Sequence, residues 1–563
     1  MTMFCFQCQE TLRNEGCTQH GMCGKSSDCS NLMDVLIYAV RGLALACELS
    51  EVPVSSQIAR HIERVLFTTV TNTNFDELRI ESLIRETLRL RNDVVHDYEE
   101  KFADHSGDIL FWNASTRNEF LAKSPMLSVQ IVSDRDARSM REFLLYGLKG
   151  ICAYTWHAQR LGFENEQISR FLVHALAATI PTREYHPSHL LSLLKDCGKM
   201  ALAAMKILNE ANTHHFGSPE ITLVRNTVGN RPGILVSGHD LRDLEDLLIQ
   251  TMDVGIDVCT HGEMLPAHAC PELKKFPHLL GNYGSSWWHQ NSEFEKFNGP
   301  ILMTTNCLIP VRESYKARLF TTGTCGWPGI RHIPEPEDGH MKDFSEIIRL
   351  AKTCAPPEPL IQQPDGSPEP EWLTTGFAFR QLMACADEIA AGLKSGEIQK
   401  LVVMAGCDGR HSSRKYWQDL AGKLPENTLI LTAGCAKYRF NKLQLGSIGS
   451  LPRVLDAGQC NDSWSIARFL MELCEMMQVE SVNDLPVYFD IAWYEQKAVA
   501  VLLGLLALGV KNITLGPTLP AFCSPNLVKY LAENYGLKRI KSAEEDLQEI
   551  CADTKCEELI CES

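Results

Sequence analysis

The apolar residues of this chain change their spacing near Gly217. Over residues 30–213 they recur every three or four positions with charges on the opposite face, which is typical of amphipathic helices. Beyond Gly217, short apolar runs such as GILVSG, KLVVMAG and TLILTAG alternate with helical stretches. Alternating strands and helices indicate α/β domains with mainly parallel sheets. The sequence therefore predicts an N-terminal helical bundle domain followed by two Rossmann-like α/β domains.

Six prolines in residues 355–372 separate the two groups of predicted strands and indicate a linker or an extended crossing. We expect residues 1–217 to hold the helical domain, residues 218–360 the first α/β domain and residues 361–563 the second. The stretch 103–135 is less regular. The acidic C-terminal segment that begins at Glu544 is expected to be a solvated tail.

Composition excludes several classes of protein. Apolar residues make up 45% and charged residues 22%, as in ordinary globular chains, and the net charge of −16 disfavours nucleic-acid binding. The longest apolar run, residues 498–510, is too short to span a bilayer. No secretory signal is visible. We therefore expect a soluble, cytoplasmic protein with no nucleic-acid partner and no membrane span; an organelle of an anaerobe is not excluded.

Four of the 22 cysteines lie close to the N-terminus in the spacing C-x2-C-x8-C-x5-C. They are Cys5, Cys8, Cys17 and Cys23. Four thiolates hold one iron–sulfur cluster or one structural zinc. The apolar neighbours Phe4, Phe6 and Met22 favour a cluster, because they shield it from water, although zinc and unliganded thiols remain alternatives. Cys29 lies outside the spacing and is interpreted as a bystander.

Metal-binding side chains follow seven of the predicted strands. They are His239, Glu263, Cys307, Cys407, Cys435, Cys460 and Glu495. Ligands of open α/β sheets gather at the carboxyl ends of strands, so these side chains are expected to form one large site between the α/β domains. Small residues before the cysteines, such as Gly406 and Gly434, allow close backbone approach. Thiolates mixed with carboxylates and an imidazole favour a cluster with oxygen as well as sulfur chemistry.

Other interpretations of these residues stay open. A lone cysteine at the end of a strand is usually a small buried hydrophobe, and Glu263 is also compatible with a cap or a surface position. Cys259, His261, His268 and Cys270 surround Glu263 and offer an alternative zinc site, though without knuckle turns. Lys497 starts an apolar helix, where the helix dipole disfavours a cation, and this favours a role in the site. The glycines of residues 446–450 do not follow a strand and carry little weight as a phosphate cradle.

Long segments of the chain resemble the hybrid-cluster proteins, a family also called prismane proteins or hydroxylamine reductases. The resembling segments are FCFQCQET, GCTQHGMCGK, LVSGHDL, THGEMLPAH, GNYGSSWW, ILMTTNC, VVMAGCDGR, LTAGCAKYR, VLDAGQCND, DIAWYEQKAVAVLL and LGPTLPAF. They run from residue 4 to about residue 523. The resemblance implies a helical domain followed by two α/β domains, a scaffold that the family shares with nickel carbon-monoxide dehydrogenases.

The resemblance also implies cofactors. A 4Fe-4S cluster would be bound by Cys5, Cys8, Cys17 and Cys23. A hybrid 4Fe-2S-2O cluster would be bound by His239, Glu263, Cys307, Cys407, Cys435, Cys460 and Glu495. Cys407 would correspond to the cysteine that carries the persulfide. The resemblance assigns no role to Cys325, Cys523, Cys551, Cys556 and Cys561.

The implied activity is reduction of hydroxylamine to ammonia and water, with electrons arriving from a ferredoxin or a flavin/iron–sulfur reductase. We expect the substrate to bind iron near Glu263, and Glu495, Lys497 and His239 to be candidates for catalytic proton delivery. Nitric oxide reduction to nitrous oxide in nitrosative-stress defence, and protein trans-nitrosylation, are alternatives on the same cluster. Carbon-monoxide dehydrogenase activity is disfavoured, because two carboxylates suit oxygen-bridged iron better than a nickel–thiolate site.

Overall fold

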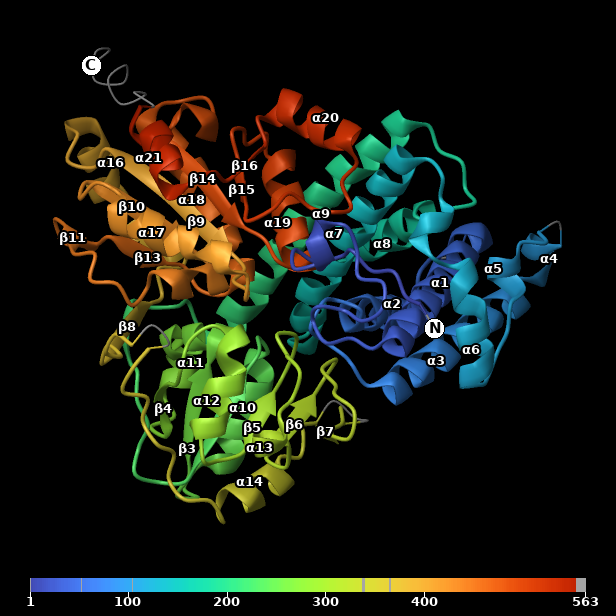
Figure 1. Ribbon diagram of the computed structural model, residues 1–563, viewed down its shortest axis with the longest axis horizontal. Coiled ribbons are helices and arrows are strands. Elements are labelled where there is room, and N and C mark those ends of the chain that lie inside the picture. The colour runs from blue at the N-terminus through green and yellow to red at the C-terminus, as the bar shows by residue number, and fades with distance from the viewer. Residues whose placement is uncertain (1, 52, 104, 337–339, 364–365, 553–563) are drawn as a thin grey trace.

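The computed structural model describes residues 2–51, 53–103, 105–336, 340–363 and 366–552. Three regions surround the centre of the molecule (Figure 1). The blue and teal helices of the N-terminal part fill one side. The green and yellow sheet and the orange and red sheet lie one below the other on the opposite side. The predicted class, a helical part followed by α/β parts with mainly parallel sheets, is confirmed. We propose the predicted boundaries, residues 1–217, 218–360 and 361–563, as the domain limits.

The N-terminal part is built from amphipathic helices. They are α1 (Ser27–Ser50), α2 (Ser56–Thr68), α3 (Glu77–Asp97), α4 (Glu99–Phe102), α5 (Asp108–Phe111), α6 (Arg117–Lys123), α7 (Arg135–Arg160), α8 (Glu166–Ala178) and α9 (Pro187–Phe216). The side chains of Ser26, Asp76 and Asp134 accept bonds from the first free backbone N–H groups of α1, α3 and α7. The apolar faces of α1, α7 and α9 pack into one core.

The first large sheet has the strand order β4-β3-β2-β5-β6-β7, and all its pairs are parallel. Its strands are β2 (Gly233–Ser237), β3 (Asp257–His261), β4 (Leu279–Asn282), β5 (Ile301–Met303), β6 (Leu319–Thr322) and β7 (Arg331–Ile333). Its helices are α10 (Leu241–Thr251), α11 (Pro271–Lys274), α12 (Gln290–Lys296), α13 (Glu313–Lys316) and α14 (Ser345–Ala351). Every residue of β2 and β3 is buried, as expected for parallel strands covered on both faces.

The second large sheet is also parallel, in the order β13-β10-β9-β14-β15-β16. Its strands are β9 (Lys400–Gly406), β10 (Thr428–Thr432), β13 (Val454–Asp456), β14 (Val487–Ala492), β15 (Thr514–Gly516) and β16 (Lys538–Arg539). Its helices are α15 (Phe379–Ala384), α16 (Ala386–Ser395), α17 (Lys415–Lys423), α18 (Ser463–Met477), α19 (Gln496–Ala507), α20 (Pro525–Tyr535) and α21 (Ala543–Ala552).

Two small antiparallel pairs complete the sheets. Strand β1 (Thr222–Arg225) pairs with β8 (Trp372–Thr375). The segments just before the first large sheet and at the end of the proline-rich stretch are therefore hydrogen-bonded to each other. The glycine-rich residues 446–450 belong to a hairpin of β11 (Ser447–Ile448) and β12 (Leu451–Pro452), which fits the low weight given to them as a phosphate cradle.

Helix α19 packs tightly between α7 and α9 of the N-terminal part. Glycines make this approach possible: a Cβ on Gly150 would lie 2.5 Å from the carbonyl oxygen of Gln496, and one on Gly198 would lie 2.2 Å from that of Leu503. Because the start of α19 is fixed in this way, Glu495 and Lys497 are fixed at the junction of the helical part with the second sheet.

The C-terminal segment differs from the prediction of a solvated tail. Residues 543–552 form α21, with Asp546 and Ile550 buried. Cys551 is exposed on this helix, whereas Cys556 and Cys561 lie outside the described residues. Among the helices that the structure describes, none is long and apolar enough to cross a bilayer.

Candidate metal centre

One buried cavity lies where the carboxyl ends of the two large sheets meet the helical part. It is lined by His239, Glu263, Cys307, Cys407, Cys435, Cys460, Glu495 and Lys497, together with Thr71, Asn72, Trp287, Asn306, Gly406 and Tyr494. The first three of these side chains follow β2, β3 and β5, and the next four follow β9, β10, β13 and β14. The seven strand-end residues singled out in the sequence are thus neighbours, although they are up to 256 positions apart in the chain (495 − 239).

Two glycines allow the strand ends to approach one another. Gly406 has φ +111°, and a Cβ there would lie 2.1 Å from the carbonyl oxygen of Ala492. Gly434 has φ +83°, and a Cβ there would lie 2.5 Å from the carbonyl oxygen of Gly406. The small residues before the cysteines therefore permit backbone to approach backbone. That contact brings Cys407 and Cys435 to the same cavity.

Cys307 adopts a backbone conformation that only glycine adopts without strain, with φ +88°. Such a residue costs on the order of 1–3 kcal/mol and persists where its surroundings fix it. The side-chain amide of Gln290 donates to the carbonyl oxygen of Cys307 at 2.5 Å, and the amide of Asn72 donates to that of Leu308 at 2.7 Å. The strain points to a position where the direction of the thiol matters.

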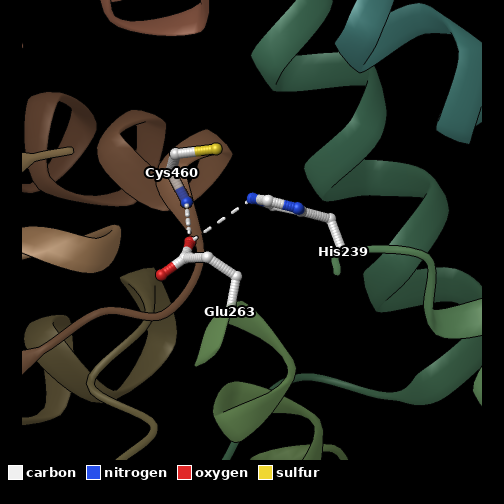
Figure 2. A group of neighbouring side chains, drawn as sticks. All are labelled: His239, Glu263 and Cys460. Carbon is white, nitrogen blue, oxygen red and sulfur yellow. Dashed lines mark hydrogen bonds and ion pairs between the residues drawn. The ribbon is translucent and has the colours of Figure 1, made fainter. Parts of the chain in front are cut away.

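His239, Glu263 and Cys460 form the tightest group of possible ligands, with ligand atoms all within 4.8 Å of one another (Figure 2). Nε2 of His239 lies 3.8 Å from Oε2 of Glu263, and the backbone N–H of Cys460 donates to the same oxygen at 3.1 Å. Gln459 clamps the group across the two sheets, because its side-chain amide donates to the carbonyl oxygens of Glu263 at 2.8 Å and of His239 at 3.1 Å.

Lys497 extends from the start of α19 into the same cavity. Its ammonium lies 2.9 Å from Nε2 of His239, 3.0 Å from Oδ1 of Asn306 and 3.6 Å from Oε1 of Glu495. Burial lowers the pKa of Lys497, but the negative charges that Cys460 and Glu495 carry when ionised outweigh burial and raise it above its ordinary value. Lys497 therefore holds its proton at neutral pH.

Burial disfavours the charged forms of the potential ligands. Burial raises the pKa of Cys460 to about 12 and raises the pKa of Cys407, Glu263 and Glu495. For Cys435, the hydrogen bond with Cys307 and then burial raise the pKa. Burial, followed by the charge of Lys497, lowers the pKa of His239. Positive charge that enters the cavity favours ionised thiols and carboxyls, and it keeps the imidazole neutral, which is the form that binds a metal.

The four N-terminal cysteines form a second group at the surface of the helical part. Cys8, Cys17 and Cys23 are buried and Cys5 is partly exposed, and Cys5 and Cys17 pair as a short antiparallel bridge. Burial raises the pKa of Cys5 to about 11 and that of Cys8 still further, with the other cysteines adding to the shift for Cys8. No three of these four sulfur atoms lie within 4.8 Å of one another, which is wider than a single zinc ion requires.

Hydrogen bonds connect the two groups of cysteines. The backbone N–H of Gln9, next to Cys8, donates to the carbonyl oxygen of Tyr494, next to Glu495, at 2.9 Å. The fully buried guanidinium of Arg414 donates to Oε1 of Gln9 at 2.8 Å and to the carbonyl oxygen of Cys407 at 3.2 Å. A short path of bonded and hydrogen-bonded atoms thus joins the two groups.

Both donor sets fit iron–sulfur chemistry. The cysteines of the described residues are free, and the thiols of both donor sets would need a bound cation to be buried as thiolates. At the metal-centre cavity, Oε1 of Glu263 is buried without a hydrogen-bond partner, which is the state of a carboxylate that has room to bind a metal. Soft sulfur ligands suit iron–sulfur clusters, and the two carboxylates suit iron bound partly by oxygen.

The alternative zinc site around Glu263 gains no support from the geometry. His261 bonds through Nδ1 to Ser237 and through Nε2 to Glu293, and His268 bonds through Nε2 to Thr260. Among the described residues, the only group that meets the spacing of a single-ion site is His239, Glu263 and Cys460. His261 and His268 are therefore buried, hydrogen-bonded histidines.

Several cavity residues carry no sequence signal. Thr71 and Asn72 come from the loop after α2, and Asn306 and Gln459, which precede ligand candidates inside resembling segments, are not assigned a role by their residue type alone. Polar residues in loops are common, so only their position in space distinguishes them. Trp287 and Tyr494, whose rings lie 4.8 Å apart, belong to resembling segments but have no ligand atoms typical of metals.

Comparisons with known proteins find relatives over nearly the whole chain. The sequence profile of the Prismane/CO dehydrogenase family matches residues 3–548. A hydroxylamine reductase of Chlorobaculum tepidum is 53% identical over 98% of this chain and 100% of its own length. Hydroxylamine reductases of Halothermothrix orenii and Nitratidesulfovibrio vulgaris are 48% and 49% identical, each over 98% of this chain and 100% of the relative.

Solved structures with the same fold include carbon monoxide dehydrogenase IV from Carboxydothermus hydrogenoformans. It matches with a TM-score of 0.57 and 16% identity, over 98% of this chain and 93% of that one. The alpha subunits of an acetyl-CoA synthase/carbon monoxide dehydrogenase match with a TM-score of 0.56 and 14% identity, over 99% and 88% of the two chains. At this identity the likeness concerns the fold alone.

Proposed function

The chain belongs to the Prismane/CO dehydrogenase family, and on this premise we propose that it is a hydroxylamine reductase. It reduces hydroxylamine to ammonia and water, consuming two electrons and two protons as the N–O bond breaks. Relatives that carry this name match nearly the whole chain at about half identity. The observation that carries the proposal is the cavity where four thiols, two carboxyls and an imidazole meet one ammonium.

The proposal assigns a cofactor to each donor set. Iron–sulfur clusters are the cofactors that the family and the buried thiols support. We assign a 4Fe-4S cluster to Cys5, Cys8, Cys17 and Cys23. We assign a hybrid 4Fe-2S-2O cluster to His239, Glu263, Cys307, Cys407, Cys435, Cys460 and Glu495, with Cys407 as the persulfide. When bound, the clusters supply electrons and an iron at which a small nitrogen compound binds.

The chain's own groups would bind the substrate and deliver protons. Lys497 holds a proton at Nζ inside the cavity, where it can reach a leaving hydroxyl group. Asn306 orients this ammonium through Oδ1 and donates from Nδ2 to Oε1 of Glu495 at 3.4 Å. Oε2 of Glu263 accepts a hydrogen bond from Cys460, and Oε1 has no partner. A metal bond at Oε1 could therefore form or break while Oε2 keeps its hydrogen bond. His239 is oriented by Thr305, whose Oγ1 lies 3.1 Å from Nδ1.

The electron path would begin at the N-terminal cysteines, of which Cys5 is partly exposed. We propose a ferredoxin or a flavin/iron–sulfur reductase as the donor. The hydrogen bond from Gln9 to Tyr494 and the bonds of Arg414 to Gln9 and Cys407 connect the segment of Cys8 with the metal-centre cavity.

The test is a comparison of kcat/KM for hydroxylamine and nitric oxide on one anaerobic, iron-loaded preparation with the same reduced donor. Iron and acid-labile sulfide are measured first, because a zinc protein would contain neither. We expect hydroxylamine consumption to equal ammonia formation, and kcat/KM for hydroxylamine to match or exceed that for nitric oxide. Absence of ammonia, or a preference for nitric oxide by several decades, would overturn the proposal.

A further inference from the structure

A large polar cavity lies beside the metal centre and is not part of it. Its volume is about 480 Å³. Most of its lining residues are polar. The lining includes Ser286, Trp288, Asp408, Gln418, Arg439 and Lys442. It reaches the surface at Gln444 and Pro368, which are exposed.

The two cavities share one wall. Trp287 lines the metal-centre cavity and Trp288 lines the polar cavity. In the same way Cys407 faces one cavity and Asp408 the other. Cys435 lines the metal-centre cavity, and Tyr438 of the same short helix lines the polar one. The polar cavity therefore adjoins the metal centre, and Trp288 packs against the buried cluster that includes Trp287 and Cys435.

Asp408 holds this wall together. Its carboxylate accepts a bond from Nε1 of Trp288 at 2.8 Å and another from Nε of Arg439 at 2.6 Å. The guanidinium of Arg439 also lies 5.1 Å from the ring centre of Trp288 and donates to the carbonyl oxygen of Gly409 at 2.7 Å. Trp288 is thus held by polar contacts at its edge, which can exchange with water when the ring moves.

The lining suits a small neutral polar molecule. The two cations that face the cavity are both compensated, Arg439 by Asp408 and Lys442 by Glu369 at 2.6 Å, so the cavity has no strong net charge. Ser286 is 1% exposed, and its Oγ has no hydrogen-bond partner. A buried hydroxyl without a partner is costly, and it offers a bond to a molecule in the cavity.

A second cavity touches the metal centre from another direction and has the opposite character. It has a volume of about 40 Å³, contacts Cys407 and Cys460, and is lined by apolar residues such as Ile466, Leu470 and Val501. A molecule with several hydrogen-bonding groups loses a few kcal/mol on entering apolar surroundings. Hydroxylamine is such a molecule, so the apolar cavity disfavours it.

We infer that the polar cavity is the access chamber for hydroxylamine, and that Trp288, held by Asp408 and Arg439, is the gate between this chamber and the metal centre. The inference rests on the proposed function, because it names the route to that same site. It assigns a binding role to Ser286 and a positioning role to Asp408 and Arg439.

The test compares two cavity-filling variants of the iron-loaded enzyme. Gln418→Trp narrows the polar chamber from α17, away from every proposed ligand, and Ala467→Phe blocks the apolar cavity from α18 as the control. Two quantities are measured: kcat/KM for hydroxylamine, and the rate constant at which O-methylhydroxylamine, a bulkier polar probe, changes the absorbance of the reduced clusters after rapid mixing. The second readout does not depend on turnover.

We expect Gln418→Trp to lower both second-order rate constants by about tenfold, with unchanged iron content and unchanged kcat, because it slows access alone. Ala467→Phe should change neither by more than about twofold. Values for Gln418→Trp within twofold of the wild type, or equal losses in both variants, would overturn the inference. If the wild type forms no ammonia, the proposed function fails, while the spectroscopic rates still decide the route.

A third variant tests the gate without filling the chamber. Trp288→Ala removes the ring and should favour the bulkier probe, raising the rate for O-methylhydroxylamine relative to hydroxylamine by about fivefold. An unchanged ratio would contradict a gate at Trp288. This variant also decides the matter if Gln418→Trp does not fold.

Discussion

The ammonium of Lys497 lies 2.9 Å from Nε2 of His239, the ring nitrogen that faces the metal-centre cavity. A neutral imidazole nitrogen has one lone pair, so His239 accepts from Lys497 or binds a metal through that atom, but not both. Iron at His239 would therefore free Lys497 to donate elsewhere in the cavity. Asn306 and Glu495, the other partners of its ammonium, keep it there.

Replacing Lys497 by methionine tests its role as proton donor. We expect Lys497→Met to lower kcat for hydroxylamine about a hundredfold, because general acid catalysis of this kind contributes roughly 10²–10⁴-fold. Iron content and the electron paramagnetic resonance spectra should stay unchanged. The matched control is Lys511→Met, an exposed lysine just beyond the other end of α19. A kcat within twofold of the wild type in Lys497→Met would remove it from the mechanism.

Cys460→Ala tests the assignment of the large cluster. The variant should lose the spectroscopic signals of the hybrid cluster and keep those of the N-terminal 4Fe-4S cluster, because the two donor sets share no residue. Cys474→Ala is the control, since Cys474 is a buried thiol of α18, the helix that starts just after Cys460. Redox-resolved electron paramagnetic resonance measures both clusters in one sample. Unaltered spectra in Cys460→Ala would show that this thiol is no ligand.

Gly434→Ala tests the contact between the strand ends. The new Cβ would lie 2.5 Å from the carbonyl oxygen of Gly406, at a residue with φ +83°. We expect a loss of stability of about 3 kcal/mol or more and loss of the hybrid cluster, since strain and a backbone clash add. Gly396→Ala separates the two causes, because Gly396 has φ +79° and open space around its Cβ position. That control should cost about 1 kcal/mol. Thermal unfolding followed by circular dichroism compares the two variants. Equal midpoints would exclude the backbone clash as a cause of the lost stability.

Glu86 links α3 to α2 and makes stability depend on pH. The hydrogen bond with His61, and then the charge of Arg64, lower the pKa of Glu86 from 4.5 to about 2. A lowered folded-state pKa contributes stability that is complete above pH 4.5 and is lost as the pH falls towards 2. Because the side chain is 39% exposed, we expect Glu86→Gln to cost only about 1 kcal/mol at pH 7.

The difference in stability between Glu86→Gln and the wild type should shrink below pH 4.5 and vanish near pH 2. Thermal midpoints measured across this range give the difference directly. Glu100→Gln, at an exposed position next to α3, should show no such dependence. A difference that persists unchanged at pH 2 would mean that the Glu86 carboxylate is not the cause.

Some features of the site could be read from the sequence because they depend on local chemistry. A buried parallel strand is a short apolar run, and the residue after it must lie at the carboxyl edge of the sheet. His239, Cys407 and Cys435 were found in this way. Lys497 was noticed because a cation is unfavourable at the start of a helix.

Other features have no local signature. The strained backbone of Cys307 is fixed by Gln290 and Asn72, and the clamp of Gln459 reaches 220 and 196 residues back along the chain. The acidic segment after Glu544 resembles a solvated tail by composition. Its described residues, 544–552, nevertheless belong to the packed helix α21, where the Tyr416 hydroxyl donates to Asp546 at 2.9 Å across 130 positions.

The sequence by itself determined which elements form and which metal-binding residues stand at their ends, since apolar periodicity and strand-end position are properties of neighbouring residues. Only the tertiary structure decided that two sheets face each other, that the Gly406 and Gly434 backbones touch, and that a polar chamber lies behind Trp288. Those relationships come from packing between segments far apart in the chain. The free energy of such packing depends on shape complementarity, which no short stretch of sequence contains.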